Sequence, residues 1–172
     1  MPSKILTRLI SEALLPAVLL VVAKVIGVLV LVKSFSIAWQ LNTSSLLPDF
    51  VLHDKAATVF VNSYSNLIVF VVVIIGLAWV LTKAYHFHDT HIKPSLILQL
   101  LSWNLTGLMT SSHEVYNKGV VWISYMWLVV LLIGVHTFLQ ATYLWVFVFA
   151  LVASLVATWY FVADVEREVG ER

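Results

Sequence analysis

The sequence predicts an all-α polytopic membrane protein with four transmembrane helices, in a single membrane domain that covers residues 1–172. Two features of the composition point to this fold class: 61% of the residues are hydrophobic and only 11% are charged, whereas about a quarter of the residues in a soluble domain are charged. The third is the grouping of apolar residues into runs of roughly 20, the length that crosses a hydrocarbon core. We therefore expect the lipid bilayer to surround this chain.

The predicted spans are four apolar runs, at 13–32, 67–82, 119–139 and 143–163. Residues 140–142 leave room only for a turn, so the last two spans should form an antiparallel hairpin. Asp54 is a suitable cap for a helix that begins near Lys55 and enters the bilayer at about Leu67. Residues 34–50 are interpreted as a loop on the membrane surface, and residues 164–172 as a short cytoplasmic tail.

The segment 95–110 is apolar but short for a span. Its polar residues follow one helical stripe, at Ser95, Gln99, Ser102, Thr106 and Thr110. We expect an amphipathic helix that lies in the membrane interface between spans two and three, with a re-entrant segment as the alternative.

The distribution of basic residues predicts the orientation of the chain. If 95–110 does not cross the membrane, seven basic residues share one side and two, Lys33 and Lys55, lie opposite. The seven are Lys4, Arg8, Lys83, Lys93, Lys118, Arg167 and Arg172. The positive-inside rule then places both the amino and the carboxyl terminus in the cytoplasm.

Lys24 stands near the middle of the first predicted span, where a charge costs about 2.5–3.5 kcal/mol on insertion scales. It could line a polar pathway or bind an anionic group between helices. The alternative is that it snorkels, or donates to backbone carbonyls in a packed interface. Glu12 is the only acidic residue near this span, and it lies twelve positions away, about 18 Å along a helix. An anionic partner would therefore come from another subunit, a lipid phosphate or a substrate carboxylate.

Small residues on the first and last spans predict faces at which helices pack closely, because small side chains let two backbones approach each other. These residues are Ala17, Ala23 and Gly27 on the first span, and Ala150, Ala153 and Ala157 on the last.

The polar junction 83–118 contains most of the potential metal ligands, which are His86, His88, Asp89, His91 and His113. Zinc or another transition metal accepts ligands of this kind. The alternatives are interfacial histidines that hydrogen-bond headgroups or water, and histidines that respond to pH. We predict no cofactor for this chain, with a metal ion at this junction as the alternative.

Other classes of site are disfavoured. The chain has no cysteine, which excludes disulfides, thiolate nucleophiles and iron–sulfur clusters, and its net charge of +1 argues against nucleic-acid binding. His136, the only histidine in a predicted span, lies close to the span's end, where we expect a structural hydrogen bond more than a haem ligand.

The sequence therefore favours a non-enzymatic subunit, or an interaction or scaffold component, of a membrane assembly. Its partners would be other membrane subunits or further copies of the chain. The alternative is a small oligomeric channel or transporter in which Lys24 faces a pathway that favours anions. The third hypothesis is a membrane metal-binding protein that uses the cluster at 86–91.

Overall fold

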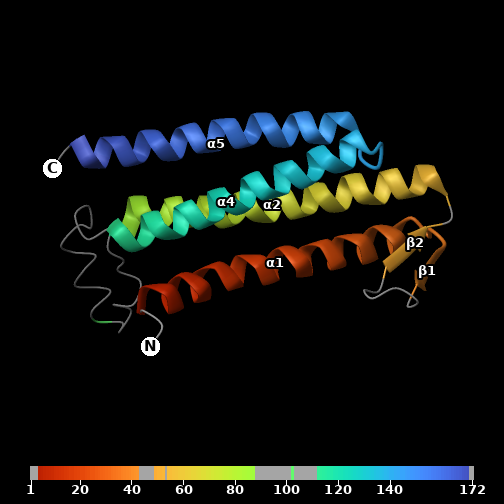
Figure 1. Cartoon of the computed structure of the whole chain (residues 1–172), viewed down its shortest axis with the longest axis horizontal. Helices are drawn as coiled ribbons and strands as arrows, with labels where there is room; N and C mark the ends of the chain where they lie inside the picture. Colours follow the sequence, from red (N-terminus) through yellow and green to blue (C-terminus); the bar gives the residue numbers. More distant parts are fainter. Residues whose placement is uncertain (1–3, 43–48, 53, 88–101, 103–111, 171–172) are drawn as a thin grey trace.

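The computed structural model describes residues 4–42, 49–52, 54–87, 102 and 112–170, and over these residues the chain forms long helices and one small hairpin (Figure 1). The helices are α1 (Lys4–Ser34), α2 (Lys55–Phe87), α4 (Ser112–Phe138) and α5 (Leu144–Gly170). The strands are β1 (Trp39–Asn42) and β2 (Asp49–Leu52).

Each of these four helices contains a stretch that is long and apolar enough to span a membrane. The stretches are Glu12–Ser34, Lys55–Lys83, Tyr116–Phe138 and Leu144–Glu166. The prediction of an all-α protein with four candidate spans is confirmed, and the architecture is compatible with a multi-pass membrane protein. The amphipathic helix predicted at 95–110 lies outside the described residues except for Ser102, so it remains a prediction.

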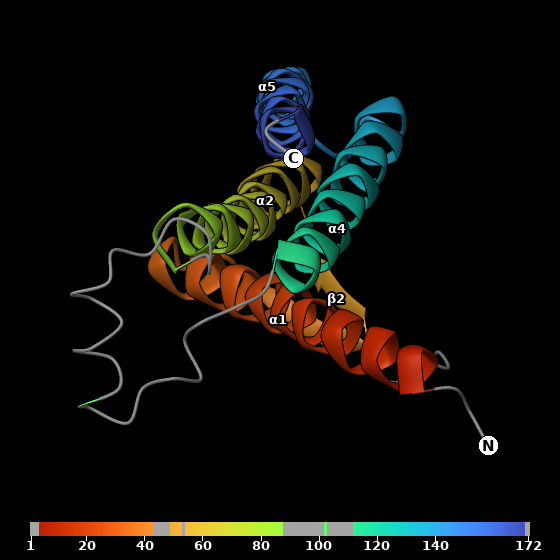
Figure 2. The ribbon, with the colours of Figure 1, turned by 90° about the vertical axis from the view of Figure 1, so that its left-hand side faces the viewer.

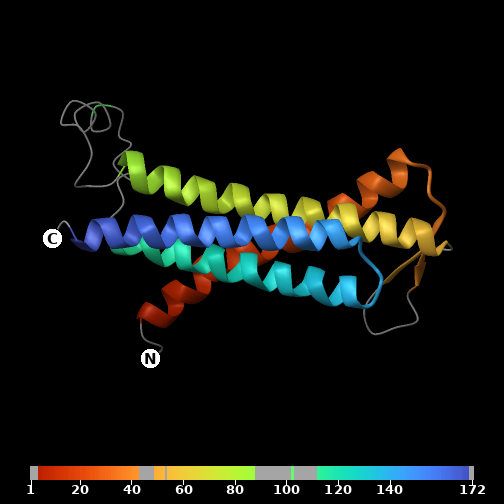
Figure 3. The ribbon, with the colours of Figure 1, turned by 90° about the horizontal axis from the view of Figure 1, so that it is seen from above.

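The helices run alternately up and down, and the ends of α1 and α5 that lie nearest the chain termini are at the same end of the bundle (Figure 1). Seen along the bundle, α2, α4 and α5 form a triangle, and α1 crosses beneath α2 and α4 at a marked angle (Figure 2). Seen from above, α5 lies over α4 and α2, on the side opposite α1 (Figure 3). Helices α2 and α4 each contact the other three helices, and the contacts of α2 with α1 and α4 are the most extensive in the bundle.

The core lies where α2, α4 and α5 meet. Its largest fully buried side chains are Phe70 and Leu77 from α2, Met126 and Ile133 from α4, and Val146 from α5. Close packing of such side chains is what holds helices together in a bilayer, because lipid tails are as apolar as the side chains themselves.

Local signals in the sequence explain where the helices begin and end. Asp54 accepts from the amide groups of Ala56 and Ala57 at 3.3 and 3.2 Å, so the predicted cap of α2 is confirmed. Beyond the end of α1, Ser36 has φ 52°, and the next amide, that of Ile37, donates to the Val32 carbonyl at 2.9 Å. This is the Schellman arrangement. A residue in the left-handed conformation turns the chain, so that its own amide and the next one donate to carbonyl groups of the last helical turn.

The segment after α1 differs from the loop that the sequence predicted. Strands β1 and β2 pair antiparallel, with Trp39 opposite Leu52. Leu52 and Ile37 pack against Val28, Val32 and Val61, so the hairpin covers the end of the α1–α2 interface. The alternation of apolar and polar residues in Trp39–Asn42 is typical of a strand, and this alternation is the signal that the loop interpretation overlooked.

Candidate functional site at Lys24

Lys24 lies on the side of α1 that faces α2, and its ammonium group is held by two side chains of that helix. Nζ donates to Ser65 Oγ at 2.7 Å and to Asn66 Oδ1 at 2.6 Å. Gly27 lies against the same helix, because a Cβ built on it would lie 3.4 Å from the Cβ of Ser65 and 3.3 Å from Ile68 Cδ1. The two helices therefore approach closely one turn beyond Lys24, which brings the acceptors on α2 within its reach.

Asn66 connects the lysine to α4 and to the turn that follows it. Its Nδ2 lies 3.2 Å from His136 Nδ1 and 3.4 Å from Thr142 Oγ1. Because Oδ1 accepts from the ammonium group, Nδ2 is the donor toward the imidazole. His136 Nδ1 is then an acceptor, and this assigns a neutral ring with its proton on Nε2.

Ser63, one turn before Asn66, joins α2 to the same turn. Its hydroxyl donates to the Val59 carbonyl at 2.6 Å and accepts from the Tyr143 amide at 2.9 Å. That amide stands at the amino-terminal end of α5, where backbone donors have no partner within the helix. A continuous set of polar contacts thus runs from α1 through α2 to the α4–α5 turn.

These contacts revise the position of Lys24 within the bundle. Thr142 lies in the α4–α5 turn and His136 in the last turn of α4, so the network is level with the end of α4. Helix α2 begins beyond that turn (Figure 1). Lys24 is therefore central when counted along the first span, but it lies near the end of the bundle when measured against α4 and α5.

Lys24 is one of the residues that line a hollow of about 600 Å³ between α1, α2 and α4, and its ammonium group is turned toward Ser65 and Asn66 on α2. Tyr125 also contributes to the hollow, with its hydroxyl directed to the Ala13 carbonyl at 3.1 Å. Lys24 is the only charged residue in the lining, which is formed by Ala17, Leu20, Val21, Lys24, Val25, Asn66, Val69, Tyr125, Leu128, Val129, Leu131 and Leu132. Among the described residues, the partners of Lys24 are the neutral Ser65 and Asn66, which hold the ammonium group without cancelling its charge.

Glu12, the other intramembrane candidate, lies apart from this network. It lines a smaller hollow of about 230 Å³ together with Lys118 and Trp122. That hollow is near the beginning of α4, whereas the Lys24 network is near its end.

The small residues singled out in the sequence fall in different environments. Ala17 lines the Lys24 cavity, and Ala23 packs against the main core. Ala150 is completely buried, while Ala153 and Ala157 line an apolar groove of about 780 Å³ between α2 and α5.

Most of the predicted metal ligands cannot be placed relative to one another. His86 lies in the last turn of α2 and His113 in the first turn of α4, while His88, Asp89 and His91 lie outside the described residues. Within the described part of the chain, no group of three or more histidine or acidic side chains could hold a metal ion. The metal site at the junction therefore stays a prediction.

Sequence reasoning did not identify the partners of Lys24. The partners expected from the sequence were backbone carbonyls or an external anionic group, whereas the structure supplies the side chains of Ser65 and Asn66. Asn66 is followed at once by a long apolar run, and a carboxamide at such a position has to find a hydrogen-bond partner. The position of Asn66 at the start of this apolar run was therefore the sequence feature that could have indicated a partner for Lys24.

Comparison with family models, with curated proteins and with solved structures finds no match to this chain.

Proposed function

We propose that this chain is a non-enzymatic component of a membrane assembly, and that it acts by presenting the positive charge of Lys24 to an anionic group from outside the chain. The observation that carries the proposal is the pairing of Lys24 with neutral acceptors at the edge of an apolar hollow. A desolvated charge attracts an opposite charge far more strongly than a solvated one does, so this position favours an anionic partner.

The arrangement supports binding more than chemistry. The groups around Lys24 are a hydroxyl, a carboxamide and, beyond the carboxamide, an imidazole whose Nδ1 accepts from Asn66. Each has a structural partner, and together they fix the direction of the ammonium group. Such a site is organised to hold a charge in place.

The experiment extracts the protein from its native membrane together with whatever is bound to it. The mass of this particle is then compared for the wild type, Lys24→Gln and Lys33→Gln. Lys33 is the matched control, because it lies on the same helix and is exposed. We expect the Lys24→Gln particle to lose mass, whereas the Lys33→Gln particle keeps the wild-type mass. An unchanged particle in Lys24→Gln, isolated with an intact fold, would contradict the proposal.

A second candidate is a small oligomeric channel or transporter that favours anions, and the position of Lys24 on the wall of a hollow supports it. Because the remaining walls are almost entirely apolar, a pathway for ions would need several copies of the chain around it. The test is anion flux into vesicles that contain the purified protein. Flux that is unchanged in Lys24→Leu would exclude a role for this residue in a pathway.

A further inference from the structure

We propose that the anionic group at Lys24 is the head of an acyl-chain amphiphile, and that the chain of this molecule lies in the hollow between α1, α2 and α4. The inference rests on the proposed function and names the class of partner. The shared chemistry is a carboxylate or phosphate attached to a long apolar tail, as in a fatty acid or an acidic phospholipid.

The hollow matches such a molecule in chemical character, because one end of it is polar and the rest is apolar. Its polar end is formed by Lys24 and Asn66, close to the α4–α5 turn. Ala17 lies seven positions earlier on α1, about 10 Å along the helix axis toward the bundle centre. Apart from Tyr125, whose hydroxyl donates to the Ala13 carbonyl, the remaining walls are aliphatic. A molecule with one charged end and an apolar body fits this gradient when its head points toward the turn.

The ammonium group has a donor left for this head. An ammonium group carries three N–H donors, and within the described part of the chain two of them are used, toward Ser65 and Asn66. A bond from the third donor to a carboxylate or phosphate oxygen would be charge-assisted, which makes it stronger than a bond between neutral groups.

The size and the apolar lining of the hollow favour an amphiphile over a free inorganic anion. About 600 Å³ is within the range of sites that take ligands of the size of a lipid chain. A small anion would leave the apolar walls unfilled and would lose its hydration without replacement from them. The end of the hollow at Lys24 is also level with the end of α4, which is where the heads of one lipid leaflet would lie.

The test is a titration of the purified protein in mild detergent, followed by native mass spectrometry. The probes are oleate for the carboxylate, phosphatidic acid for the phosphate, phosphatidylcholine as the zwitterion and diacylglycerol as the uncharged control. We expect one or both acidic probes to bind at least about tenfold more tightly than the two controls, as one charge-assisted hydrogen bond allows. Whether oleate or phosphatidic acid binds more tightly identifies the head.

Two pairs of variants locate the binding. Lys24→Gln should abolish the preference for acidic probes, while Lys33→Gln keeps it. Val21→Phe, which fills the hollow, should weaken binding of the acidic probes, while Val30→Phe, on the same helix but outside the lining, should not.

Equal binding of all four probes to the wild type would overturn the inference, and so would an equal loss in Lys24→Gln and Lys33→Gln. If Lys24→Gln disrupts the native assembly while the wild type shows no preference among the probes, the partner is an acidic protein side chain. In that case the amphiphile is excluded and the proposed function remains.

Discussion

Lys24 keeps a positive charge inside the helix bundle by donating to side chains that have no charge of their own. Inserting a lysine at the centre of a membrane helix costs about 2.5–3.5 kcal/mol, which is an upper bound for Lys24 near the end of α4, and hydrogen bonds to charged groups contribute about 1.5–3 kcal/mol each. The two bonds, to Ser65 and Asn66, are therefore sufficient in magnitude to offset the cost. Within the described part of the chain, neutral acceptors hold the ammonium group of Lys24, and we propose that its charge is available to another molecule.

Asn66 is the residue on which this network depends, because it is bonded to Lys24, His136 and Thr142. We expect Asn66→Ala to lower the free energy of unfolding by about 1–3 kcal/mol, since it leaves buried polar groups without a partner. The measurement is unfolding in mild detergent. Asn62→Ala is the control, one turn earlier on α2, and should change the stability by less than about 0.5 kcal/mol. Equal effects of the two substitutions would show that Asn66 is not the hub of the network.

At the scale of the helix, two kinds of local feature set the arrangement of the elements. The ends of α1 and α4 are closed by left-handed residues, Ser36 with φ 52° and Gln140 with φ 56°. The packing of α4 on its neighbours depends on glycines that make room for aromatic rings. A Cβ at Gly76 of α2 would overlap the ring of Trp122, and one at Gly119 would overlap Phe161.

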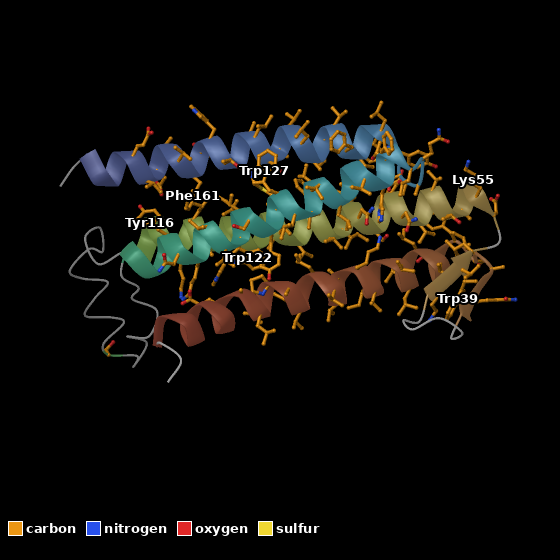
Figure 4. All side chains as sticks on the ribbon, in the orientation of Figure 1. Trp39, Lys55, Tyr116, Trp122, Trp127 and Phe161 are labelled. Atoms are coloured by element: carbon orange, nitrogen blue, oxygen red, sulfur yellow. The ribbon has the colours of Figure 1, made fainter. Side chains whose placement is uncertain are left out.

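Each of these two rings extends from its own helix to a neighbouring helix. Trp122 extends from α4 to α2, and Phe161 of α5 meets Tyr116 of α4 edge to face, with ring centroids 6.1 Å apart (Figure 4). Trp39 and Lys55 lie at the opposite end of the molecule (Figure 4). The end of the bundle at which α4 begins is thus held by aromatic rings, and the end with the α4–α5 turn is held by the polar network.

Gly76→Ala should destabilise the protein by about 1–3 kcal/mol, because the added methyl group displaces the Trp122 ring from a packed position. A double-mutant cycle with Trp122→Leu tests the reason. We expect the penalty of Gly76→Ala to fall when the ring is absent. A penalty of the same size in both backgrounds would place its origin in the α2 backbone and not in the ring.

Gln140→Gly should stabilise the α4–α5 turn by about 0.5–1 kcal/mol, because glycine adopts the left-handed conformation without the steric strain of a side chain. The Ala141 amide would keep its bond to the His136 carbonyl, now 2.8 Å. Leu139→Gly, at the preceding position, is the control and should not stabilise the protein. A loss of stability in Gln140→Gly would contradict this account of the helix end.

Sequence patterns predicted the elements better than their contacts. Long apolar runs and the Asp54 cap were enough to locate four helices, because span length and capping are local properties. The hairpin was missed because its strands are only four residues long, at Trp39–Asn42 and Asp49–Leu52. The contacts of Lys24 with Ser65 and Asn66 depend on how α1 crosses α2, which no local pattern specifies.

At the scale of the whole molecule, the alternating helices place the α4–α5 turn and the hairpin at one end, and the beginning of α1 and the end of α5 at the other (Figure 1). The distribution of lysine and arginine predicts, by the positive-inside rule, that this second end is cytoplasmic, and the orientation stays a prediction. The site at Lys24 would then face the leaflet on the far side of the membrane.

Cysteine labelling tests this orientation, and the chain has no native cysteine to interfere. We expect Glu166→Cys to react with a membrane-impermeant maleimide only from the cytoplasmic side, and Gln140→Cys only from the opposite side. Labelling of both from the same side would contradict the arrangement of four spans. Labelling of each from the reverse side would contradict the orientation alone.

The central proposal is that Lys24 binds an anionic group which the described part of the chain does not supply. The most direct measurement is the composition of the particle purified from the native membrane, with lipids, fatty acids and proteins quantified per chain. We predict that an acidic component is present in stoichiometric amount in the wild type and in Lys33→Gln, and that it is lost in Lys24→Gln. A folded Lys24→Gln protein that retains every component of the wild-type particle would contradict the proposal.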